Sequence, residues 1–198
     1  MKKVNTDFAK AEAFIASMLN EKLPATLIYH CKEHTFDVLD IAMKIARSEN
    51  LTEEEIKLLR IAVLFHDAGF VHVYKNHEEK SCEMAKEFLP GFGFSPEQIG
   101  LICEMILATK VPQNPMSLMD QIIVDADLDY LGREDVFEVA AKLFEELKLR
   151  KLIEREEDWI PYQVEFLKKH TFFTEYSKKN RGPNKDLYLR RLMDKLQP

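Results

Sequence analysis

The feature that most constrains the fold is an adjacent pair, His66-Asp67, that directly follows the apolar run 58–65. Burying an imidazole and a carboxylate beside such a run costs free energy unless a partner compensates for the lost hydration. A divalent metal ion is such a partner. His34 and Asp127 stand in similarly apolar segments. One metal ion held by residues from separate segments therefore accounts for all four polar side chains.

Composition and periodicity predict an all-α chain. Only 6 Gly and 8 Pro leave little material for a turn-rich β fold. Apolar residues recur at helical spacing, and we expect one domain spanning residues 1–198. The predicted helices are 7–19, a second from near Thr26 or Tyr29 through Ile45, 53–65, 77–88, 95–109, 117–131, 134–149, 158–170 and 185–196, with a turn at 181–184.

Charge and cysteine usage narrow the class of protein. The net charge of −6 argues against a nucleic-acid scaffold, which would carry a basic face, but a metal would still allow a small anionic substrate. The 3 cysteines are odd in number and lack CxxC spacing, which indicates reduced thiols. Residues 1–7 lack the apolar core of a signal peptide, and no apolar stretch reaches the roughly 18 residues of a membrane span. These features predict a cytoplasmic protein.

The residue types of the four polar groups suit a catalytic metal. His34 precedes Val38 and Ile45 at helical spacing and should therefore face the core. A borderline divalent ion accepts imidazole nitrogen and carboxylate oxygen together. Two histidines and two aspartates also leave coordination positions open for water or substrate, as a catalytic site requires.

Each group alone has a simpler explanation. His34 would be a hydrogen-bonded core histidine, and His66-Asp67 a local ion pair at a helix end. Asp127 would be a helix cap or a partner of Arg133, and Asp125 competes with it as a ligand.

Three stretches occur in the order H…HD…D. They are His34-Thr35-Phe36-Asp37-Val38, Leu64-Phe65-His66-Asp67-Ala68-Gly69 and the segment 123–132. Over roughly residues 25–135 this pattern resembles the HD superfamily of metal-dependent phosphohydrolases. The resemblance implies an HD-type helical bundle, with further C-terminal helices over 134–196 packing on it. It also implies hydrolysis of a phosphate ester of a small molecule, commonly a nucleotide, without a nucleic-acid or membrane partner.

The resemblance assigns roles to particular residues. One divalent ion (Mn, Mg, Fe, Co, Ni or Zn) would be held by His34, His66, Asp67 and Asp127. Such an ion lowers the pKa of a bound water to roughly 7. Asp67 would orient that water or accept its proton.

Further candidates flank the ligand segments. His77, in an HE segment after the HD pair, would be the general acid for the leaving oxygen. The alternative for His77 is a surface histidine at a helix start. Lys110 and Arg133 are candidate contacts for the substrate phosphate, with ordinary surface charges as the alternative. His30 and His72 are predicted to be surface residues.

Two departures from the family pattern bear on function. The resemblance allows a mononuclear or a dinuclear site. Dinuclear members place histidines on the helix that here ends near Thr109, and the absence of such histidines favours a mononuclear site. Some nucleotidases carry an acidic residue where this chain has Phe70, which weakens that assignment. A non-catalytic nucleotide-sensing module and a di-iron oxygenase remain alternative functions. Formation of a homodimer is also open.

Overall fold

The computed structural model describes residues 6–196. These residues form α-helices and short 3-10 helices with no strand among them, which confirms the all-α prediction. The α-helices are α1 (Phe8–Lys22), α2 (Lys32–Ser48), α3 (Glu53–Phe65), α4 (His77–Phe88), α5 (Pro96–Ala108), α6 (Leu118–Asp127), α7 (Val136–Leu149), α8 (Glu156–Lys169), α9 (Glu175–Asn180) and α10 (Gly182–Asp194). The 3-10 helices are η1 (Ala68–Val71), η2 (Leu89–Phe92) and η3 (Asp129–Gly132).

Capping boxes fix where two of the central helices begin. At the start of α3, Glu55 N donates to Thr52 Oγ1 at 3.3 Å, and Thr52 N donates to Glu55 Oε2 at 2.8 Å. Ser95 and Gln98 form the same reciprocal pair at the start of α5. Each pair satisfies two backbone N–H groups that have no partner inside the helix. Both boxes are readable in the sequence, so these starts follow from local chemistry.

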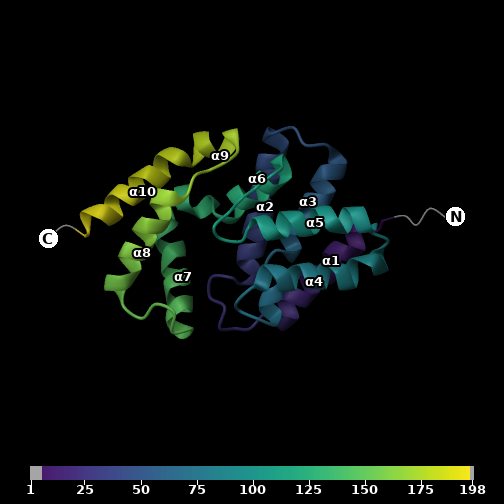
Figure 1. Cartoon of the computed structure of the whole chain (residues 1–198), viewed down its shortest axis with the longest axis horizontal. Coiled ribbons are helices and arrows are strands. Elements are labelled where there is room, and N and C mark those ends of the chain that lie inside the picture. Colours follow the sequence, from purple (N-terminus) through teal and green to yellow (C-terminus); the bar gives the residue numbers. More distant parts are fainter. Residues whose placement is uncertain (1–5, 197–198) are drawn as a thin grey trace.

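The helices fall into two groups along the long axis of the molecule (Figure 1). Helices α1 to α6 surround one apolar core, whose fully buried members include Ile15, Ile45, Phe65 and Ile106. Helices α7, α8 and α10 share a second apolar cluster with residues that precede α2 and follow α6. The two groups therefore meet beside the start of α2 and the end of α6.

Three predicted boundaries are wrong. The helix predicted over 117–131 ends at Asp127, and Asp129–Gly132 form the separate 3-10 helix η3. The second helix begins at Lys32, and the segment before it is held by the Glu146 carboxylate, which accepts from the N–H groups of Tyr29 and His30. Residues 182–184 of the predicted turn are instead the first residues of α10, and α9 before it was not predicted.

Residues 1–5 and 197–198 lie outside the described part of the chain, and with them most of the N-terminal stretch from which the absence of a signal peptide was predicted. Between residues 6 and 196, none of the helices has both the length and the apolar character needed to cross a bilayer. The single domain over residues 1–198 and the cytoplasmic location stay predictions.

Candidate metal centre

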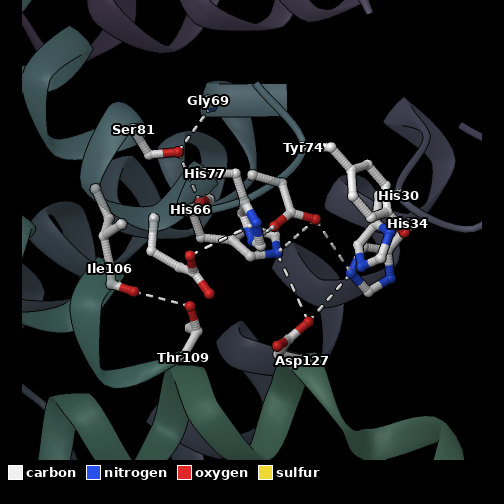
Figure 2. A network of polar contacts seen from close by, with 12 residues as sticks. His30, His34, His66, Gly69, Tyr74, His77, Ser81, Ile106, Thr109 and Asp127 are labelled. Atoms are coloured by element: carbon white, nitrogen blue, oxygen red, sulfur yellow. Dashed lines mark hydrogen bonds and ion pairs between the residues drawn. The ribbon is translucent and has the colours of Figure 1, made fainter. Parts of the chain in front are cut away.

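Four predicted ligands come together from the ends of three helices. His34 lies in the first turn of α2, His66 and Asp67 follow the last residue of α3, and Asp127 is the last residue of α6. Figure 2 shows His34, His66 and Asp127 pointing toward one another. Because α2 packs against both α3 and α6, these helix ends are held together by the core beneath them.

The distances between the donor atoms suit one shared ion. His34 Nε2 lies 3.1 Å from Asp127 Oδ1 and 3.7 Å from Asp67 Oδ2. His66 Nε2 lies 3.3 Å from Asp67 Oδ2 and 3.6 Å from Asp127 Oδ1. Two donor atoms that each lie about 2.1 Å from one ion are themselves about 3.0 to 3.4 Å apart. The four separations are close to that spacing.

The hydrogen bonding of the buried atoms also fits a metal ion. His66 is 1% exposed, and its Nδ1 donates to Val63 O at 2.7 Å. This bond leaves the Nε2 lone pair directed into the site. Within the described residues, His66 Nε2 and Asp67 Oδ2 are buried and make no hydrogen bond, although they lie 3.3 Å from each other. Buried polar atoms without partners are costly, and a bound cation would satisfy both.

The electrostatics favour positive charge at the same point. Burial alone would raise the pKa of Asp67, but the imidazole of His66 holds it well below its usual range. Burial lowers the pKa of His66, but the carboxylates of Asp67 and Asp127 together bring it well above its usual value. The aspartates are therefore ionised at neutral pH. A proton and a metal ion compete for His66 Nε2, so metal binding would release a proton.

His77 lies beside this group of donors. Its Nε2 is 3.4 Å from Asp67 Oδ1, and its ring stacks on Phe70 with centroids 3.8 Å apart and planes at 17°. The side chain is 18% exposed and lines a cavity that also reaches Asp67 and Asp127. Phe70 thus orients His77 toward Asp67. The role of His77 as a general acid stays a prediction.

A buried serine ties His66 to the helix that carries His77. Ser81 Oγ donates to His66 O and accepts from Gly69 N, both at 2.8 Å (Figure 2). A Cβ atom built on Gly69 would lie 2.0 Å from His77 O. Only glycine allows this approach, so α4 packs directly on the turn that follows α3.

Sequence reasoning missed a second buried polar group. The Glu146 carboxylate on α7 is fully buried and accepts from His30 Nδ1 at 2.5 Å and from Tyr74 Oη at 3.1 Å. The prediction that His30 is a surface residue is wrong, since its side chain is 19% exposed and lines the cavity. His72 is exposed, as predicted. One feature of the sequence could have indicated this buried group. Glu146 lies three places after Leu143 and therefore falls on the apolar stripe of α7, where an acidic side chain needs a partner.

A cavity of about 240 Å³ opens from the candidate metal centre toward the C-terminal helices. Asp67, Asp127 and His77 form one end, and side chains of α7, α8 and α10 form the other. Among residues 6–196, no lysine or arginine lines this cavity. The negative charge at its metal end would repel a phosphate unless a cation were bound there.

The candidate substrate contacts lie elsewhere. Lys110 is paired with Glu79. Arg133 donates to Asp37 Oδ2 at 2.6 Å and to Asp135 Oδ2 at 2.7 Å. Both side chains have carboxylate partners and neither lines the cavity, and their contact with substrate stays a prediction.

Two other predicted positions have clear structural roles. The competing ligand Asp125 is fully buried and accepts from Phe173 N at 2.9 Å and from Thr174 N at 2.8 Å. It anchors the segment before α9 instead of joining the metal centre. Thr109 Oγ1 donates to Ile106 O at 2.8 Å, so its hydroxyl closes the end of α5.

Comparison with known proteins assigns the chain to a family. The model of the HD domain family matches residues 32–130, a range that contains all four predicted ligands. The chain is also similar in fold to the crystal structure of a predicted HD superfamily hydrolase from an uncultured Thermotogales bacterium. The identity is 23%, the TM-score is 0.62, and the match covers 93% of this chain and 90% of the other. No curated protein matches. Because the family model covers half of the sequence, the chain belongs to the HD domain family, a family of metal-dependent hydrolases.

Proposed function

We propose that this protein is a metal-dependent phosphohydrolase that cleaves a phosphate ester of a small molecule. One divalent ion would be held by His34, His66, Asp67 and Asp127. The observation that carries the proposal is the convergence of four donor atoms, two of which are buried without hydrogen-bond partners. Two of the four residues, Asp67 and Asp127, line a cavity large enough for a substrate, which a purely structural metal site would not need.

A bound divalent ion supplies Lewis acidity toward the phosphoryl oxygen and toward water. In this proposal Asp67 Oδ1 accepts a hydrogen bond from the attacking water and orients it. The reaction forms a bond from the water oxygen to phosphorus and breaks the bond from phosphorus to the alcohol oxygen. The water proton leaves by way of Asp67, and His77 donates a proton to the departing alcohol. The 3.4 Å contact between these two side chains supports the return of the proton to His77.

An assay of phosphate release tests the proposal, starting from protein that has been stripped of metal. The protein would be resupplied with Mn, Mg, Co, Ni or Zn and assayed on a panel of phosphorylated metabolites and nucleotides. His66→Asn should lose metal binding and phosphate release together, because it removes a donor atom that points into the site. His72→Asn is the matched control, since His72 is exposed and lies outside the cavity, and it should behave like the wild type.

Two results would contradict the proposal. One is metal-dependent release that persists in His66→Asn. The other is no release with any metal from protein that still binds the ion, which would favour a sensor or an oxygenase. Iron analysis separates those two, since a di-iron oxygenase needs about two ions per chain and the proposed ligand set holds one.

A further inference from the structure

The cavity beside the metal centre has two chemically distinct halves. Away from the metal it continues into what we call the apolar chamber, formed by Leu143 and Leu147 of α7, Trp159 and Phe166 of α8, and Tyr188 of α10. These side chains belong to, or pack on, the second apolar cluster. The HD-type helices supply the polar end of the cavity, and the C-terminal helices supply the apolar end.

The distribution of charge limits what can occupy the chamber. The ionisable acids that line the cavity are Asp67, Glu78 and Asp127, all toward the metal end. In the part of the chain that the structure describes, no lining lysine or arginine offsets a second anionic group. A charge buried without a partner is costly, so the part of a ligand inside the chamber should be uncharged.

The size of the cavity points to a substantial apolar group. A cavity of about 150 Å³ with an apolar lining is enough to bind benzene. The volume here is about 240 Å³, so a phosphate at the metal end leaves room for a ring or a short alkyl chain. Val111 and Tyr162 are the exposed residues of the lining, at 58% and 55%, and they mark where the cavity meets solvent.

We infer that the substrate is a phosphate monoester of an uncharged apolar alcohol, whose aromatic or alkyl group occupies the apolar chamber. The inference rests on the proposed function, because the phosphate is taken to bind at the metal centre. A nucleoside di- or triphosphate fits poorly, since its extra phosphates would meet leucine and aromatic side chains without a cation. The C-terminal helices therefore set the specificity of the site.

Binding of two stable phosphonates tests the chamber separately from hydrolysis. Benzylphosphonate and methylphosphonate share the metal-binding group and resist hydrolysis, but only the first carries a ring. Zinc-saturated protein would be titrated with each by calorimetry and by the fluorescence of Trp159, the 1 tryptophan of the chain. Burying a phenyl ring stabilises a complex by about 1.5 to 3 kcal/mol, so benzylphosphonate should bind about 10- to 140-fold more tightly. It should also change Trp159 emission, whereas methylphosphonate should not.

A matched pair of variants on α7 locates the effect. Leu147→Asn makes the chamber more polar at similar volume and should reduce the preference for the benzyl group at least about fivefold. Leu149→Asn changes a residue that is 58% exposed and outside the cavity, and it should keep the preference. Equal affinities of the two phosphonates for wild-type protein would overturn the inference, as would tighter binding of a nucleoside monophosphate. Preferred binding of benzylphosphonate without hydrolysis of any ester would contradict the hydrolase and leave the chamber assignment standing.

Discussion

Replacing Ser81 with alanine should destabilise the turn that carries His66 and Asp67. The Ser81 side chain has no solvent exposure, and its hydroxyl serves two backbone groups at 2.8 Å each, His66 O and Gly69 N. Alanine fills nearly the same space but can neither donate nor accept a hydrogen bond. The variant therefore leaves one buried carbonyl and one buried N–H group without partners.

The expected loss follows from these two groups. A buried polar group left unsatisfied costs about 1 to 3 kcal/mol, so two cost about 2 to 6 kcal/mol. Alanine has a higher helix propensity than serine, and this difference offsets about 0.5 kcal/mol of the loss. We therefore expect the free energy of unfolding to fall by about 2 to 5 kcal/mol. In a chain of this length, each kcal/mol lowers Tm by about 2 to 4 °C, so Tm should fall by at least about 4 °C.

Urea unfolding and thermal melting, both followed by circular dichroism of the apo protein, measure this effect. Ser17→Ala is the matched control, since Ser17 also lies within a helix but is exposed and bonds only Glu21 Oε1. It should change the free energy of unfolding by no more than about 0.5 kcal/mol. If Ser81→Ala loses no more stability than this control, the two hydrogen bonds do not hold the turn and the reasoning fails.

Three further outcomes test other parts of the structure. Gly69→Ala should cost about 3 kcal/mol or more in urea unfolding and impair phosphate release, because its Cβ would overlap His77 O. Glu146→Gln turns an amide N–H₂ toward groups that already donate, so urea unfolding should show a loss of about 2 to 4 kcal/mol. Burial lowers the pKa of His170 from 6.5 to about 4. Between these two pH values, His170 therefore binds a proton in the unfolded chain but not in the folded chain. Stability should fall by about 3 kcal/mol from pH 7 to pH 4 through this group. His170→Leu should remove that part of the pH dependence, whereas His72→Leu should not.

The sequence by itself determined most helices and the order of the site residues. Thr52 with Glu55, and Ser95 with Gln98, fix helix starts through bonds within four residues, so local sequence is sufficient to predict them. The apolar stripe that follows His34 likewise depends only on helical spacing. The convergence of the four candidate ligands could be expected from their apolar settings, and their role as ligands stays a prediction.

The tertiary structure decided what surrounds the candidate metal centre. Helix α2 starts at Lys32, and the segment before it is held by Glu146, 117 residues after Tyr29, which accepts from the N–H groups of Tyr29 and His30. The same carboxylate makes His30 a partly buried residue of the cavity instead of a surface one. The apolar chamber exists only where three C-terminal helices meet the HD-type helices. The spacing of residues along the chain does not predict these contacts, because they join groups that become neighbours only after the two cores have packed.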